Sequence, residues 1–181
     1  MSNEEFQSQL EKILHEQNQH NYKLANELCA SLVNQVEHLL QTEQYENRID
    51  VIVMNARALA LMSEILLYLG NPTESLVFSL KSLTYAKESG NKQRIALLLN
   101  FIGKIYAELS EYELALEFYT KAIAFYKELG DRLNEAYSIG NIGILHQNHA
   151  DYAKAKEHYL LALETYKELD SKGDIAVVYV N

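Results

Sequence analysis

Apolar side chains recur at the spacing of one helix face in the best-patterned parts of the chain. Ala115 and Ala122 stand seven residues apart with Tyr119 between them, and residues at this spacing share a face of an α-helix. One proline, seven glycines and few β-branched runs leave little of the turn chemistry that β-hairpins require. The pattern predicts an all-α protein.

This pattern repeats every forty residues. Residues 91–130 and 131–170 align without a gap and share twelve identities in forty positions. The identical pairs include Ala96 and Ala136, Ile102 and Ile142, Gly103 and Gly143, Tyr112 and Tyr152, Ala115 and Ala155, Tyr119 and Tyr159, and Ala122 and Ala162. Residues 51–90 are a degenerate copy, with Ser63, Ser75 and Ser79 at matching positions and Pro72 in place of the tyrosine. Residues 171–181 match the opening of another repeat.

Small residues at fixed positions predict close packing of paired helices. Gly103 and Gly143 offer no side-chain bulk, so a second helix can cross closely there, and Tyr119 fills the space beside Ala115 and Ala122. We expect a solenoid in which each repeat contributes one antiparallel hairpin.

Caps define the expected helix limits. Gly90 and Gly130 are predicted left-handed caps, Asn91, Asp131 and Ser171 are candidate N-caps, and Asn71 before Pro72 begins a helix. The predicted helices cover residues 4–18, 21–45, 48–69, 72–89, 92–109, 112–129, 132–149, 152–169 and 172 to the end.

These positions resemble the tetratricopeptide repeat pattern of a large residue, Leu-Gly, Tyr, and then Ala, Phe and Ala. The residues that carry the resemblance are Leu99, Ile102, Gly103, Tyr106, Tyr112, Ala115, Tyr119 and Ala122, and their counterparts Ile139, Ile142, Gly143, Tyr152, Ala155, Tyr159 and Ala162. His146 departs where the family has tyrosine, and the usual 34-residue period is stretched to forty. The longer form resembles repeats in bacterial signalling proteins and peptide-responsive regulators. The resemblance implies an all-α, right-handed superhelical solenoid over residues 51–181, with repeats at 51–90, 91–130, 131–170 and a partial one at 171–181.

Residues 1–50 are predicted to form a degenerate N-terminal hairpin. Phe6, Leu10, Ile13 and Leu14 stripe its first helix, and Tyr22, Ala25, Cys29 and Leu32 reproduce the spacing of Tyr112, Ala115, Tyr119 and Ala122. Ten extra residues, near Gln41 to Asp50, separate this hairpin from the next repeat. It is expected to sit at an altered angle or to act as a cap on the solenoid.

Charge and composition indicate which classes of partner and which location to expect. Sixteen basic and twenty-five acidic side chains give a formal net charge of −9, which repels phosphate backbones, so nucleic acid is not expected as a partner. The most apolar stretch, Val51 to Leu69, contains Asn55, Arg57, Ser63 and Glu64, so no membrane span is expected. A single cysteine and a polar first twenty residues favour a reducing, cytoplasmic location.

Candidate chemistry gives no catalytic site. Cys29 occupies a position whose equivalents are core aromatics, which predicts a buried structural thiol. His146 and His149 lie three residues apart, but His146 takes a core position and no acidic or cysteine ligand has a suitable spacing. Numerous glutamates lie beside lysines, as on a solvated helix face, and no phosphate-binding loop or nucleophile elbow occurs. Neither enzymatic activity, nor a cofactor, nor a metal is expected in this segment.

The family's geometry implies that the first helix of each hairpin lines a binding groove. The predicted groove residues are Arg57, Glu64, Tyr68, Leu97, Asn100, Lys104, Glu108, Tyr137, Asn141, Ile144, Gln147 and Asn148, with Ala60, Leu67, Ala107 and Gly140 between them. Asn141, with a counterpart at Asn181, resembles the asparagine ladder by which some family members hold a peptide main chain. The alternative is an asparagine that hydrogen-bonds a neighbouring helix. Ala60, Glu64 and Phe101 replace the residues with which other members clamp a C-terminal carboxylate, so that subtype is not expected.

These features predict a protein- or peptide-binding scaffold or sensor, the N-terminal part of a larger bacterial signalling protein. Two alternatives remain: a regulator that responds to a peptide pheromone, or the regulatory region of an enzyme, a cyclase or histidine kinase, with a catalytic domain downstream. Residues 175 to 180 leave an apolar helix side without a partner, which predicts weak self-association through the C-terminal end, or fraying beyond Asp174.

Overall fold

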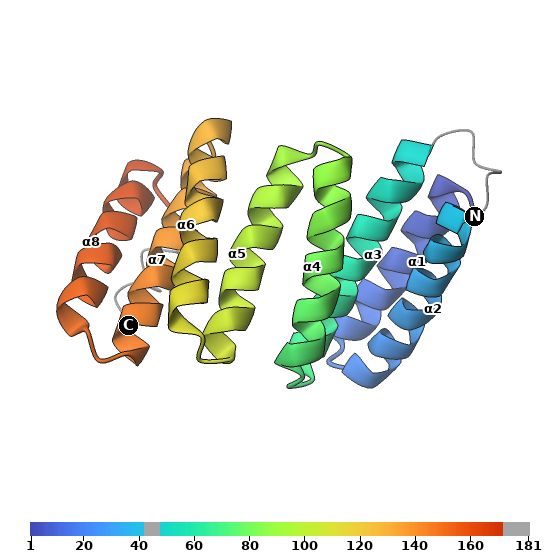
Figure 1. The fold of residues 1–181 in the computed structure, drawn as a ribbon, viewed down its shortest axis with the longest axis horizontal. Coiled ribbons are helices and arrows are strands. Elements are labelled where there is room, and N and C mark those ends of the chain that lie inside the picture. Colours follow the sequence, from blue (N-terminus) through green and yellow to red (C-terminus); the bar gives the residue numbers. More distant parts are fainter. Residues whose placement is uncertain (42–47, 172–181) are drawn as a thin grey trace. The chain divides into compact units, whose positions relative to one another are not determined.

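Helices make up nearly all of residues 1–41 and 48–171, the part of the chain that the computed structural model describes (Figure 1). They are α1 (Asn3–Asn18), α2 (Tyr22–Gln41), α3 (Arg48–Tyr68), α4 (Pro72–Glu88), α5 (Lys92–Glu108), α6 (Tyr112–Leu129), α7 (Arg132–Asn148) and α8 (Tyr152–Glu168). No strand occurs within these two ranges. The prediction of an all-α protein is confirmed.

The predicted helix limits agree with the structure to within one residue at every end that it describes. The expected continuation of α2 through residue 45, most of the ten extra residues, and the helix from residue 172 that Ser171 was predicted to cap fall outside the described ranges. The predicted self-association through residues 175 to 180 falls there as well.

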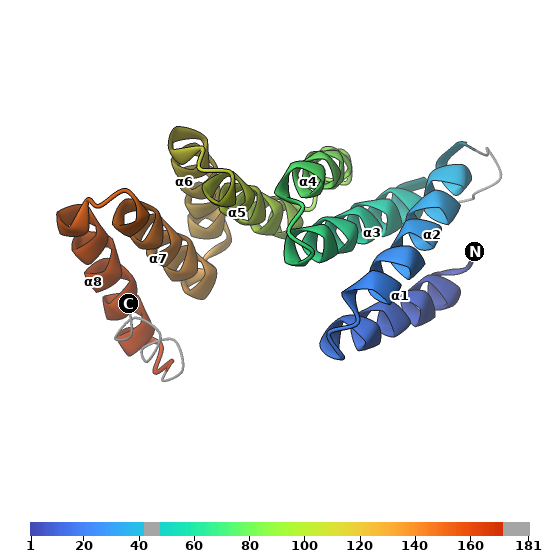
Figure 2. The ribbon, with the colours of Figure 1, turned by 90° about the horizontal axis from the view of Figure 1, so that it is seen from below.

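The helices form two compact units, each built from two hairpins. Unit 1 covers residues 1–91 with α1 to α4, and unit 2 covers residues 92–181, of which α5 to α8 are described. Within unit 1, α3 packs against both α2 and α4. Within unit 2, α7 packs against both α6 and α8 (Figure 2). The boundary between the units, after Asn91, lies one residue beyond a boundary of the forty-residue repeat. The separate prediction, a hairpin or cap at 1–50 followed by repeats, stays a prediction.

A residue in the left-handed region ends the turn after each helix except α2, beyond which the chain is not described. The residues are His20, Gly70, Gly90, Ser110, Gly130, Ala150 and Asp170, with φ of 59°, 77°, 69°, 61°, 69°, 59° and 51°. From Gly70 onward they recur every twenty residues, half the repeat. The left-handed conformation predicted for Gly90 and Gly130 is confirmed, but four turns use residues with a Cβ, for which this conformation is unfavourable.

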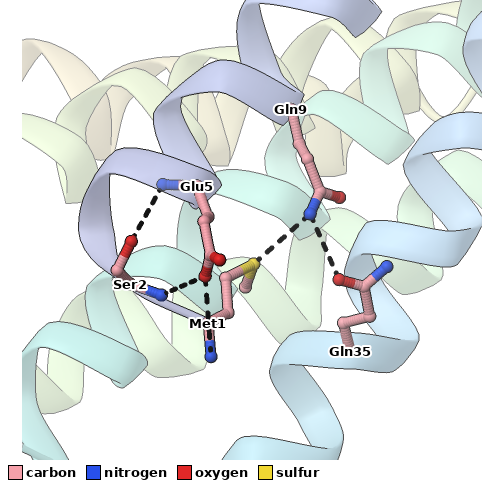
Figure 3. A network of polar contacts seen from close by, with 5 residues as sticks. All are labelled: Met1, Ser2, Glu5, Gln9 and Gln35. Atoms are coloured by element: carbon pink, nitrogen blue, oxygen red, sulfur yellow. Dashed lines mark hydrogen bonds and ion pairs between the residues drawn. The ribbon is translucent and has the colours of Figure 1, made fainter.

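Side-chain caps fix several helix starts. Asn71 accepts a hydrogen bond from the Glu74 amide at 3.3 Å ahead of Pro72, and Asp131 accepts one from the Asn134 amide at 3.2 Å, as predicted. At α1 the Ser2 hydroxyl accepts from the Glu5 amide at 3.1 Å while the Glu5 carboxylate accepts from the Ser2 amide at 2.6 Å, a capping box (Figure 3).

The N-terminal hairpin is joined by apolar and amide contacts. Phe6, Leu10 and Ile13 are buried, as predicted, but Leu14 is 44% exposed, so its place in the stripe was wrong. Among the described helices α1 packs mainly against α2, with a smaller contact with α3, and its buried apolar residues are Phe6, Leu10 and Ile13. The Gln9 amide donates to Gln35 of α2 at 3.2 Å (Figure 3).

In each hairpin of unit 2, a glycine of the first helix lies against a tyrosine ring of the second helix. A Cβ placed on Gly103 would lie 2.8 Å from Cδ1 of Tyr119, and one on Gly143 would lie 2.7 Å from Cδ1 of Tyr159. Atoms cannot approach so closely unless the ring or one helix shifts, so the absence of a side chain at the glycine leaves room for the ring. The predicted close crossing of helices is confirmed at both repeats.

Serines replace this pair in unit 1. Ser63 and Ser79 occupy the glycine and tyrosine positions, and their hydroxyl oxygens lie 2.5 Å apart. The Ser63 hydroxyl lies 2.7 Å from the Ser75 carbonyl oxygen, and the Ser75 hydroxyl lies 2.7 Å from the Ser63 carbonyl oxygen. Either hydroxyl of the Ser63–Ser79 pair can be the donor. All three side chains are fully buried. A hydrogen-bonded serine pair therefore fills the space that glycine and tyrosine fill elsewhere.

Helix α3 is the single described helix that is long and apolar enough to cross a membrane by length and composition. In the structure, 67% of its most apolar window is buried against the rest of the chain, as in a core helix. Its polar residues Asn55 and Ser63 lie within that core, both fully buried. Length and composition are thus weak evidence for a span here.

Candidate functional site

The predicted groove residues lie on α3 in unit 1 and on α5 and α7 in unit 2. We call the unit 2 set the first-helix face: Leu97, Asn100, Lys104, Glu108, Tyr137, Asn141, Ile144, Gln147 and Asn148. None of these side chains is fully buried. They repeat at intervals of three and four residues on each helix, which places them on one side of it.

In unit 1 two of the three predicted residues are held by the N-terminal hairpin. The Arg57 guanidinium donates to Gln7 of α1 at 3.2 Å and lies 5.5 Å from the centre of the Phe6 ring. Tyr68 stacks on Tyr22 of α2 with ring centres 5.2 Å apart and remains 58% exposed. Glu64 is half-buried on the same helix.

An amide network joins α5 to α7 on the first-helix face. The side-chain oxygen of Asn100, Oδ1, accepts a hydrogen bond from the side-chain amide of Asn141 at 3.2 Å and one from the Ser138 hydroxyl at 3.0 Å. The open alternative for Asn141, a bond to a neighbouring helix, is therefore present. This bond uses one of the amide's two N–H groups, and an asparagine amide can also accept.

Apolar side chains flank this network. Leu97, Tyr137 and Ile144 are 46%, 41% and 41% exposed, and the Tyr137 ring meets the buried Tyr166 ring edge to face at 5.6 Å. Lys104, Glu108 and Asn148 are exposed, while Gln147 accepts a hydrogen bond from the Tyr159 hydroxyl at 2.5 Å. The face thus offers amide groups between exposed apolar side chains, an arrangement suited to binding a peptide main chain and its side chains.

Cys29 is a core residue. Its side chain is fully buried in the core of unit 1, and its thiol donates to the Ala58 carbonyl at 3.5 Å. Burial raises the pKa of the thiol to about 12. The predicted buried thiol is confirmed, and a thiol with this pKa stays protonated near neutral pH, which opposes a nucleophilic role.

We expect Cys29→Ser to destabilise the protein by about 1–3 kcal/mol, because a strongly polar hydroxyl would replace the thiol in an apolar core. Urea unfolding followed by circular dichroism measures the loss. In the native protein Cys29 should react with a bulky maleimide far more slowly than in urea, and equal rates would contradict the burial.

A histidine cluster lies where α6, α7 and α8 meet. His146 is 4% exposed, in the core position predicted for it, and its Nδ1 lies 2.8 Å from the Tyr112 hydroxyl. Its ring lies 5.0 Å from that of His158, and the His149 ring lies 4.1 Å from Tyr112. Sequence reasoning missed His158, because position 118 of the preceding repeat is phenylalanine and gave no polar signal. Within the described ranges no three His, Cys, Asp or Glu side chains are arranged to hold a metal ion.

Acid is expected to destabilise unit 2 through His146. Burial, followed by the nearby His158 and Lys154, lowers the pKa of His146; Asp151 opposes this, while His149 adds to it and Tyr112 bonds the ring. Above the unfolded pKa of about 6.5 the ring is neutral in both states and contributes no pH dependence. As pH falls through that value the unfolded chain takes up the proton more readily, so stability declines.

The measurement is the urea midpoint between pH 7.5 and pH 5, compared with that of His146→Phe. The phenylalanine variant loses the bond to Tyr112 but cannot titrate at this position, so its midpoint should fall less over the same range. Equal pH slopes for the two proteins would rule out His146 as the source.

The repeats of this chain match a known family of repeat proteins. A tetratricopeptide repeat model matches residues 55–128 and again residues 94–168, together more than half of the chain. No curated protein matches the chain in sequence.

Solved structures match it in fold. Aspartyl phosphate phosphatase F from Bacillus subtilis matches 93% of this chain with a TM-score of 0.79 at 15% identity, over 42% of its own length. A Rap protein complexed with competence and sporulation factor matches 87% with a TM-score of 0.68 at 19% identity, over 42% of its length. A signal transduction ATPase with a tetratricopeptide repeat sensor, from Pyrococcus horikoshii, matches 94% with a TM-score of 0.67 at 17% identity, over 31% of its length.

This chain therefore spans less than half the length of each of these three structures. At these identities the likeness shows the fold alone, that of helical-hairpin solenoids.

Proposed function

Because the chain belongs to the tetratricopeptide repeat family, a repeat module of the protein- or peptide-binding kind, we propose that it binds its partner on the first-helix face. The observation that carries the proposal is the arrangement on α5 and α7. There the Asn100–Asn141 pair lies among Leu97, Tyr137 and Ile144, all exposed by 41% or more. Amides can pair with any peptide main chain, and the apolar side chains can bury those of a ligand.

We further propose that the chain is a sensory or scaffolding part of a larger signalling protein of bacterial type. Two of the similar structures support this: one is a Rap protein in complex with a factor, and another contains a repeat sensor within a signal transduction ATPase. The Rap complex favours one second candidate, a regulator that responds to a peptide. A catalytic domain in the same protein is the remaining alternative.

We expect the pair of changes Asn141→Ala and Tyr137→Ala to weaken binding of a partner peptide by about tenfold or more, as is usual when central contacts are removed. The matched control is Glu117→Ala with Lys121→Ala. These two residues pair with each other at 2.5 Å on α6, both about half exposed. Titration calorimetry on peptides selected from a displayed library measures the affinity, and a greater loss in the control would contradict the proposal.

A further inference from the structure

Gly140 is the one described glycine whose lack of a side chain has no cause within the chain. Gly70, Gly90 and Gly130 have positive φ, and Gly103 and Gly143 lie against tyrosine rings. Gly140 lies inside α7 without a positive φ, and apart from its own turn of helix a Cβ there would meet no atom within 4 Å. A glycine inside a helix destabilises it relative to alanine, so this position is less stable than the surrounding space would allow.

The surroundings of Gly140 are those of a binding surface. Tyr137 and Ile144, three residues before it and four after it on the same side of α7, are each 41% exposed. Asn141, the next residue, is held against Asn100 of α5 by the 3.2 Å bond. Gly140 therefore forms a low point between two exposed apolar side chains, beside an oriented amide.

The same face carries an exposed cation. Lys104 lies one turn beyond Asn100 on α5, and it forms no ion pair among the described residues. Lys92, Lys121 and Lys154 of unit 2 each have a carboxylate partner, whereas the exposed Lys156 and Lys167 form no ion pair among the described residues, like Lys104. Lys104 is the one lysine of the first-helix face, with Glu108 one turn further along α5, and a negative group of a ligand would complement the charge of Lys104.

We propose that Gly140 is the point at which the main chain of an extended peptide comes closest to α7, and that an acidic side chain of that peptide reaches Lys104. A methyl group at position 140 would push the peptide away from the Asn141 amide. The inference rests on the proposed function and specifies which residues of the first-helix face receive the ligand and what chemistry the ligand has.

The test begins with stability, which needs no ligand. Gly140→Ala should raise the Tm by about 2–4 °C, since alanine favours the helix and its Cβ meets open space. Gly103→Ala is the matched control, and it should lower the Tm because its Cβ would lie 2.8 Å from the Tyr119 ring. A lower Tm for Gly140→Ala would mean that the glycine has a role inside the fold and would overturn the inference.

The binding arm uses peptides selected on the unmodified protein from a phage-displayed library of random extended sequences, then synthesised with a fluorophore. The selected peptides should share an acidic residue. Their affinity, from fluorescence anisotropy, should fall by about tenfold or more for Gly140→Ala and also fall for Lys104→Gln. A variant that is more stable yet binds less cannot owe its loss to misfolding.

Other outcomes separate the two proposals. Peptides that depend on Asn141 and Tyr137 but bind Gly140→Ala with unchanged affinity would overturn this inference and leave the proposed function standing. Peptides without an acidic residue, insensitive to Lys104→Gln, would overturn the assignment of ligand charge. No selected peptide, or peptides unaffected by all of these changes, would overturn both proposals.

Discussion

Replacing Ser79 with tyrosine is expected to lower the free energy of unfolding by about 3 kcal/mol, because the ring would have to fit into a fully buried position whose hydroxyl lies 2.5 Å from that of Ser63. The same residue type is accommodated in unit 2, at Tyr119 and Tyr159, where a glycine stands opposite. The variant would also remove the Ser79 hydroxyl that is hydrogen-bonded to Ser63. Urea unfolding followed by circular dichroism provides the measurement.

The second change Ser63→Gly should restore much of this stability. It recreates the glycine and tyrosine pair of the other repeats, so the double variant should be more stable than Ser79→Tyr alone. Ser79→Ala is the control that removes the hydrogen bond without adding bulk, with an expected loss of about 1 kcal/mol. If the effects of Ser79→Tyr and Ser63→Gly on stability simply add, a glycine–tyrosine pair cannot replace the serine pair at this position.

Tyr119→Ala should have a still larger effect, a loss of about 3–5 kcal/mol, since it removes a ring that is 3% exposed and leaves a cavity against Gly103. Tyr119→Phe keeps the ring and should change stability by less than about 1 kcal/mol. Chemical denaturation of the three proteins tests this. A phenylalanine variant as unstable as the alanine one would show that the hydroxyl, and not the ring, stabilises the crossing.

The forty-residue alignment predicted the helices because repetition constrains each position more than once. Gly103 aligns with Gly143 and Tyr119 with Tyr159, so the same contact could be inferred from two copies. In unit 1 the alignment indicated only that Ser63 and Ser79 were exceptions. That the serines bond to each other depends on hydroxyl positions across two helices, which spacing along a chain does not specify.

The candidate site was predictable in its location and less so in its contacts. The resemblance to the family implied which residues of α5 and α7 share a face, and in the structure these residues are half-buried or exposed. The bond from Asn141 to Asn100 joins positions forty-one residues apart, one step off the repeat, so the alignment paired Asn141 with Phe101 instead. Only the rotation of neighbouring helices brings the two amides together.

Four of the left-handed turns are positions where substitution could raise the stability of the chain. His20, Ser110, Ala150 and Asp170 hold a conformation that glycine adopts more easily, at a cost of about 1–2 kcal/mol for a residue with a Cβ, partly offset because glycine gains more freedom on unfolding. None of the four belongs to the first-helix face. Substitutions to glycine at these four turns can therefore raise stability without altering the proposed ligand contacts. A protein with such substitutions could then tolerate destabilising changes on α5 and α7 during the evolution of binding to a new partner.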